Sequence, residues 1–137
     1  VQTCALPIFM FTAGKGREGD QALLEKALAR GRFMELAGED RFSKQQCDEL
    51  FLAGLLSHLE PVLRVPLRRI ADRMTLADGV RQVLLDCAGP YAPYLMLALG
   101  MERGQSMAQL AERVDVSPED LNRRSISAVE WAVEAAA

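Results

Sequence analysis

The sequence predicts one all-helical domain, on the strength of three observations. Residues 50 to 56 are seven consecutive residues without a polar side chain, which is typical of a buried helix. Apolar residues elsewhere recur at helical spacing. Start signals and breakers separate these stretches, among them Ser43 and Gln46 at capping-box spacing and the pair Gly89-Pro90.

Composition limits the classes of function that the chain can have. Its 137 residues are 50% hydrophobic and carry a net charge of −3, which gives no general attraction to nucleic acid or to an anionic membrane. No apolar run approaches the ~18 residues needed to span a bilayer, so we expect no membrane partner and a cytoplasmic protein. The cysteines Cys4, Cys47 and Cys87 are odd in number and far apart, and they fit neither a disulfide framework nor a zinc site.

The amino-terminal residues are set apart from the domain. Residues 1–8, VQTCALPI, look like a translated sequencing adapter, so we expect an artefact there and a domain over residues 9–137 that is truncated at its N-terminus. Phe9 to Phe11 is interpreted as the tail of an upstream helix, and Thr12 to Asp20 as a loop. The GKG within this loop lacks both the spacing and the preceding strand of a phosphate-binding loop, and no other cofactor motif is found.

The next two helices are predicted around the apolar run. Residues 21–36 form an apolar stripe that ends at Gly38 as a C-cap, with Arg30 and Arg32 toward the polar side. The central helix follows the Ser43 cap and leaves at Pro61. Gly54 in its middle costs about 1 kcal/mol relative to alanine, which indicates that another backbone passes close by.

The rest of the chain continues as short helices, each with its own boundary signal. Cys47 and Cys87 are expected to be packing residues in this arrangement. Trp131, Val129 and Val133 are expected to cover the end of the core. The predicted helices span residues 66–73, 78–87, 91–101, 106–114 and 117–137.

Three segments together resemble a known family. GLLSHLE (Gly54 to Glu60) resembles the GLLHDIG-like segment of the HDOD domain, a helical relative of the HD phosphohydrolases. The segments Ala27 to Gly38 and Pro66 to Leu85 look like flanking helices of the same domain. The match is to the C-terminal half of the HDOD domain in bacterial EAL–HDOD signalling proteins, and it covers roughly residues 9 to 137. It implies a helical HD-like bundle.

The resemblance places Ser57 and His58 at the His-Asp doublet with which HD hydrolases bind metal. A serine hydroxyl is a poor ligand, and a hydrolytic metal site needs at least three protein ligands. His58 is the only histidine of the chain. We therefore expect a degenerate HD position without a metal, no catalytic residues and no enzyme activity in these residues. Any EAL phosphodiesterase domain would lie upstream.

The function that the resemblance implies is non-catalytic signal transduction through protein–protein contacts, in a bacterial protein linked to cyclic di-GMP. The densest group of basic residues could bind an acidic partner, although a solvated helix face is the simpler interpretation. That group consists of Arg64, Arg68, Arg69 and Arg73. Truncation is also expected to expose apolar surface and to favour self-association.

The alternative is a DNA-binding regulator with a helix-turn-helix at about residues 106–126. Its second helix would direct Asn122, Arg123 and Arg124 toward DNA. Two observations make nucleic acid an unfavoured partner. Asp115 stands where such turns favour glycine, and surrounding acidic residues oppose approach to phosphate.

Overall fold

The computed structural model describes residues 18–137, and these fold into helices with no strand, which confirms the predicted all-helical class. The predictions for residues 1–17, including the adapter segment, lie outside the described residues. None of the helices from α2 to α9 combines the length and apolar character needed to span a bilayer. The helices are α2 (Glu18–Ala37), α3 (Lys44–Ser57), α4 (Leu59–Leu63), α5 (Leu67–Arg73), α6 (Asp78–Asp86), α7 (Ala92–Glu102), α8 (Met107–Val114) and α9 (Pro118–Ala136).

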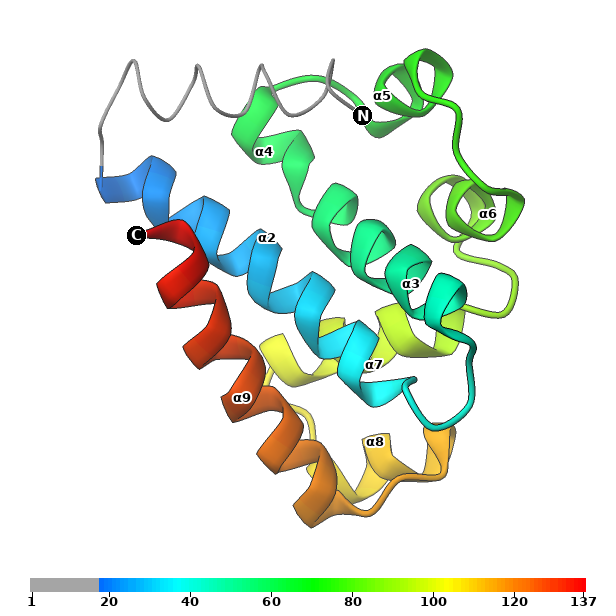
Figure 1. The fold of residues 1–137 in the computed structure, drawn as a ribbon, viewed down its shortest axis with the longest axis vertical. Helices are drawn as coiled ribbons and strands as arrows, with labels where there is room; N and C mark the ends of the chain where they lie inside the picture. The colour runs from blue at the N-terminus through cyan, green and yellow to red at the C-terminus, as the bar shows by residue number, and fades with distance from the viewer. Residues whose placement is uncertain (1–17) are drawn as a thin grey trace.

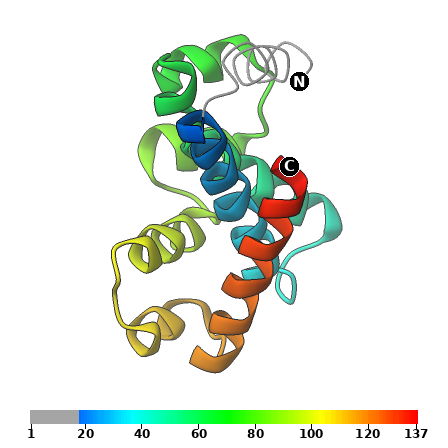
Figure 2. The same ribbon diagram turned by 90° about the vertical axis from the view of Figure 1, so that its left-hand side faces the viewer.

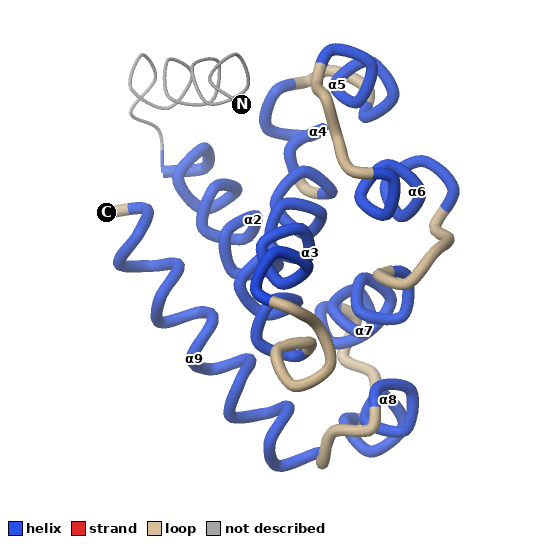
Figure 3. Tube along the Cα trace, turned by 45° about the vertical axis from the view of Figure 1, so that its right-hand side comes forward, coloured by secondary structure: helices blue, strands red, loops and turns tan. Residues whose placement is uncertain are grey.

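Helix α2 lies between α3 and α9 and runs antiparallel to both (Figure 1). A hydrogen bond from Gln21 Nε2 to the Ala136 carbonyl oxygen, 3.3 Å long, joins the start of α2 to the end of α9. Helices α7 and α8 cover one end of these three helices (Figure 2), and α4, α5 and α6 follow α3 at the other end (Figure 3). The long helix at the centre is therefore α2 and not the segment around α3 that the apolar run indicated.

Two glycines allow α2 and α3 to cross closely. A Cβ atom on Gly54 would lie 2.6 Å from the Gly31 Cα, and one on Gly31 would lie 2.6 Å from the Phe51 carbonyl oxygen. Real Cβ atoms do not approach backbone atoms that closely, so neither site accepts a side chain without a backbone shift. This confirms the close backbone approach predicted at Gly54. The capping box of Ser43 and Gln46 at the start of α3 is also confirmed.

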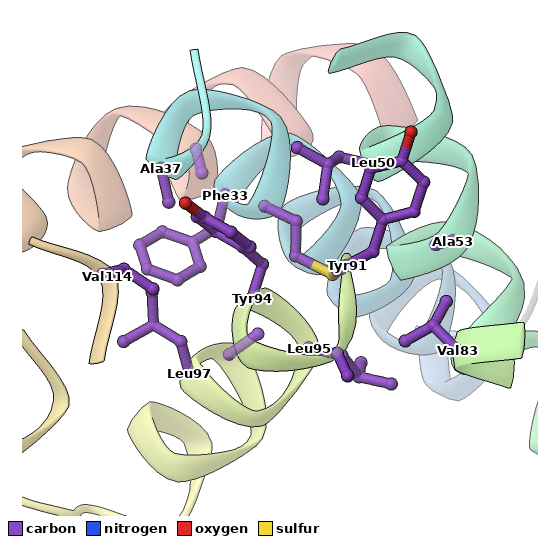
Figure 4. Packing of buried hydrophobic residues seen from close by; sticks show 14 of the residues in the cluster. Phe33, Ala37, Leu50, Ala53, Val83, Tyr91, Tyr94, Leu95, Leu97 and Val114 are labelled. Atoms are coloured by element: carbon purple, nitrogen blue, oxygen red, sulfur yellow. The ribbon is translucent and has the colours of Figure 1, made fainter. Parts of the chain in front are cut away.

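The core joins residues of α2, α3, α6, α7 and α8 (Figure 4), and α4, α5 and α9 add Leu59, Ile70, Leu121 and Ala128. Phe42 packs edge-on against the rings of Tyr91 and Tyr94, at centroid distances of 5.5 and 5.4 Å. The Tyr91 hydroxyl donates a 2.6 Å hydrogen bond to Glu49 Oε1, so this polar group is satisfied inside the core. Burial is the main reason that the pKa of Tyr91 is raised, and Glu49 adds to it.

The sequence-based description of α2 was wrong in two respects, its start and its polar face. The helix begins at Glu18, within the predicted loop. It ends at Ala37, directly before Gly38 as predicted, and Gly38 also leaves room for Leu50, whose Cδ1 would lie 2.6 Å from a Cβ there. Arg30 is only 9% exposed, and Arg32 lies over the Trp131 ring at 5.4 Å, so neither arginine belongs to a solvated face.

The exit of the apolar helix was also placed wrongly. Helix α3 ends at Ser57, and the chain resumes as α4, which contains Pro61. Proline is tolerated there because the first turn of a helix has no internal acceptors for its N–H groups. Helix α4 ends at Arg64, a non-glycine residue in the left-handed conformation (φ 57°).

Three side chains expected to be internal are exposed. Cys47 is buried as predicted, but Cys87 is exposed, because α6 ends at Asp86 and Cys87 turns into the left-handed conformation. On α9, Trp131 is half-buried, whereas Val129 and Val133 are 53% and 48% exposed. Helix α9 contacts the core through Leu121, Ala128 and Ala132 instead.

Candidate functional site

The predicted degenerate HD position, Ser57 and His58, lies at the break between α3 and α4. The Ser57 Oγ donates to the Gly54 carbonyl oxygen at 2.7 Å, one turn earlier in α3. The same oxygen accepts a hydrogen bond of 3.0 Å from Arg30 Nη1. Ser57 therefore connects the end of α3 to the middle of α2.

Arg30 joins this position to α7. Its Nε and Nη2 donate to the two carboxylate oxygens of Glu102, at 2.8 and 2.6 Å. The Arg30 side chain is 8% exposed and that of Glu102 is 43% exposed. Such a bidentate, charge-assisted pair fixes the orientation of the guanidinium group. One arginine therefore holds α2, α3 and α7 together.

His58 lies close to this cation. Its Nε2 is buried and has no hydrogen-bond partner within the described part of the chain. Burial is the main reason that its pKa is lowered, and the positive charges of Arg30 and Lys26 lower it further, while Glu102 opposes the shift. Burial and the neighbouring positive charges therefore both disfavour the protonated form of His58.

This arrangement is unfavourable for a divalent cation. The guanidinium of Arg30 already donates to Ser57, and a second cation beside it would be repelled, because like charges interact strongly where water is partly excluded. In residues 18–137 there is no group of three or more His, Cys, Asp or Glu side chains arranged to hold a metal.

A small pocket of about 200 Å³ lies between α2, α7 and α9, next to the pair. Arg30 and Glu102 line one part of it, and Phe33, Ala98 and Met101 give it an apolar wall. Arg30 and Glu102 neutralise each other within this pocket, and Lys26 is a third charged residue of its lining. Sequence analysis missed the Arg30–Glu102 pair. The available signal was that Arg30 directly precedes Gly31, which lies where α2 crosses α3.

The four predicted docking arginines are brought together on α4 and α5, and we call them the arginine face. Arg64 ends α4, and Arg68, Arg69 and Arg73 are exposed on α5. None of the four forms an ion pair with a residue of the described part of the chain.

Helices α8 and α9 do form a helix-turn-helix pair, with Asp115 adopting the left-handed conformation (φ 56°) that was expected to need glycine. However, Arg124 is not available to a phosphate. It is 13% exposed, and it donates to the Leu36 carbonyl oxygen, to Asp40 Oδ2 at 2.8 Å and to Asp120 Oδ2 at 2.9 Å. Arg123 is exposed and pairs with Asp120 at 2.7 Å. Arg124 thus attaches α9 to α2, whereas the ion pair of Arg123 lies within α9.

Comparison with known proteins gives one relative at low identity. The chain is similar to the cyclic di-GMP phosphodiesterase CdgJ of Vibrio cholerae. The two are 26% identical over 111 residues, which is 80% of this chain and 26% of the relative. The chain thus spans about a quarter of the length of the curated relative that it matches. No family model matches the chain, and no solved structure matches it.

Proposed function

We propose that this chain is a non-catalytic regulatory module of the HDOD type, which acts through protein–protein contacts in a bacterial signalling protein linked to cyclic di-GMP. The similarity to a cyclic di-GMP phosphodiesterase supports the signalling context. The all-helical fold is the one that the HDOD resemblance implies.

The observation that carries the proposal is the position of Arg30. In HD hydrolases the doublet binds a metal, and here the corresponding Ser57 binds a guanidinium group at 3.0 Å. The cation is covalently part of the protein and is paired with Glu102, so it supplies neither a Lewis acid nor an activated water. The site holds helices together, and we assign it a structural role.

A direct test is to incubate the purified chain with cyclic di-GMP in the presence of Mg²⁺ or Mn²⁺ and to follow the product by chromatography. We expect no turnover above that of a matched sample of the Ser57→Ala/His58→Ala variant. Metal-dependent turnover that this variant loses would overturn the proposal, because it would assign a hydrolytic role to these two residues.

Metal binding gives an independent measurement. In a calorimetric titration with Mn²⁺, we expect no saturable heat at the Ser57–His58 position. Saturable binding that disappears in the Ser57→Ala/His58→Ala variant would contradict the structural role of the site, even if no turnover were seen.

A further inference from the structure

Two surfaces of opposite charge lie at opposite ends of the molecule (Figure 1). One is the arginine face on α4 and α5. The other, which we call the acidic hollow, lies on α8 and the start of α9 and is lined by Glu112 and Asp115. We propose that the acidic hollow of one copy of this chain docks on the arginine face of a second copy, head to tail. This inference rests on the proposed function, because it identifies one of the protein contacts through which such a module would act.

The arginines of the arginine face form no ion pair within the described part of the chain. Four of the chain's 16 lysine and arginine residues lie between residues 64 and 73, although the whole chain is negative. Arg69 and Arg73 are one helical turn apart on α5, and like charges at this spacing destabilise a helix. The nearby acid on α5, Asp72, is already paired with Arg81 at 2.9 Å. A carboxylate from outside would therefore remove a repulsion that nothing internal relieves.

The surface that carries these arginines is held in place. Glu60 Oε2 accepts a 3.0 Å hydrogen bond from the Leu67 backbone N–H, which fixes the start of α5 against α4. A hollow of about 400 Å³ lies at this junction and is lined by Glu60, Arg64, Val65 and Pro66. The wall of this hollow carries one cation, Arg64, and one carboxylate, Glu60, which already accepts the Leu67 N–H.

The complementary surface is the acidic hollow, of about 460 Å³, whose charged lining residues are Glu112 and Asp115. Its other lining residues are small or apolar, and none is basic. Glu119 is exposed and follows the lining residue Pro118 directly. Within the described part of the chain, the cation that pairs with a lining residue of the hollow is Arg41, whose Nη2 lies 3.8 Å from Asp115 Oδ2, with both side chains more than half exposed. Such an exposed pair is weak and can be exchanged for another.

Charge distribution favours a second copy over a long polyanion. A hollow beside Arg68 is also lined by Asp78 and Asp86, so a nucleic acid strand that followed α5 would meet negative charge. The acidic hollow offers a short group of carboxylates instead. Because the two surfaces differ, the contact is heterologous, and it leaves one surface of each kind free for further copies.

The experiment is sedimentation velocity on the whole chain and on two charge-reversal variants, Arg69→Glu/Arg73→Glu and Glu112→Lys/Glu119→Lys. We expect the unmodified chain to associate with rising concentration at low ionic strength and to dissociate as salt screens the charges. Each variant alone should lose at least about tenfold in association constant. An equimolar mixture of the two variants should associate again, because each then presents the charge that the other lacks.

The matched control is Glu130→Lys/Glu134→Lys, which makes the same charge change at exposed positions of α9 outside the hollow. It should associate like the unmodified chain. Circular dichroism of every variant checks that the fold is kept. A chain that stays monomeric at low salt, or a mixture that fails to associate, would refute the docking.

Apolar association would give a different result. Ile126, Val129 and Val133 form an exposed stripe on α9. Association that resists salt and is abolished by Ile126→Lys/Val133→Lys would assign self-association to this stripe and overturn the charge-based contact. Neither outcome depends on the cyclic di-GMP assay, so failure of the docking and failure of the proposed function can be told apart.

Discussion

Gly31 and Gly54 face each other where α2 crosses α3, and the contact between their backbones brings Arg30 within reach of Ser57. A Cβ on Gly54 would lie 2.6 Å from Gly31 Cα and 3.0 Å from the Arg30 carbonyl carbon. The hydrogen bond from Arg30 Nη1 to Ser57 Oγ forms one turn further along α3. The two glycines thus determine both the packing of the two helices and the geometry of the candidate site.

The first prediction concerns this crossing. Gly54→Ala should lower the free energy of unfolding by about 1–3 kcal/mol, because the new methyl group overpacks against backbone, and this outweighs the better helix propensity of alanine. Urea denaturation, followed by the fluorescence of the single Trp131, measures the change. The control is Gly19→Ala, also in α2, where a Cβ would meet nothing within 4 Å, so stability should be unchanged or slightly higher. Equal losses in both variants would contradict the close crossing.

The second prediction concerns the ion pair. Arg30→Met should lower the free energy of unfolding by about 1–3 kcal/mol, because Glu102 loses its ion-pair partner and Ser57 loses a hydrogen-bond donor. The loss should be smaller than for a fully buried ion pair, because water reaches the half-exposed Glu102. A double-mutant cycle with Glu102→Gln should show a coupling energy between the two positions. Arg68→Met, at an exposed arginine without an internal partner, is the control and should change stability by less than about 0.5 kcal/mol. Additive single-site effects would mean that the pair contributes nothing.

The third prediction separates two neighbouring arginines of α9. Arg124→Met should cost about 1–2 kcal/mol, because the Leu36 carbonyl at the end of α2 loses its side-chain donor and Asp40 and Asp120 lose a shared cation. Arg123→Met should cost less than about 0.5 kcal/mol, since that pair is exposed. Thermal melts at neutral pH measure both. If Arg123 proved the more important for stability and Arg124 had no effect, the attachment of α9 to α2 through Arg124 would be refuted.

The sequence was informative wherever a structural requirement is local. The capping box at Ser43 and Gln46 depends on residues within one turn, and it forms as its spacing indicated. The all-helical class followed from helical periodicity, which is likewise a local property.

The features that escaped sequence analysis depend on packing between distant segments. Arginine usually lies on a solvated helix face, but here Arg30 pairs with Glu102, which is 72 residues away in the sequence, and Arg32 lies over the Trp131 ring. Nothing in the spacing of α2 marks these partners. The exposure of Val129 and Val133 has the same origin, because the face of α9 that is buried is decided by its contact with α2. Ser57 and His58 were singled out by the family resemblance, whereas the contact of Ser57 with Arg30 was visible only in three dimensions.

The last prediction concerns the pH dependence of stability, and it uses the only histidine of the chain. The pKa of His58 in the folded protein is lowered from its ordinary value of 6.5, chiefly by burial. As the pH falls below about 7, the unfolded chain takes up a proton that the folded chain resists, so the free energy of unfolding should fall. The loss stops growing once the pH passes below the folded-state pKa.

The His58→Gln variant should lose this dependence between about pH 7 and pH 5, a window in which ordinary carboxylates contribute little. Melting temperatures across the window measure it, and the Cε1 proton resonance of His58 reports its pKa directly. In Arg30→Met the pKa of His58 should rise, because a nearby positive charge is removed, yet stay below 6.5, because burial remains. A His58 pKa that does not respond to Arg30→Met would show that the guanidinium is not held beside the imidazole, and would remove the main argument for a structural cation at this position.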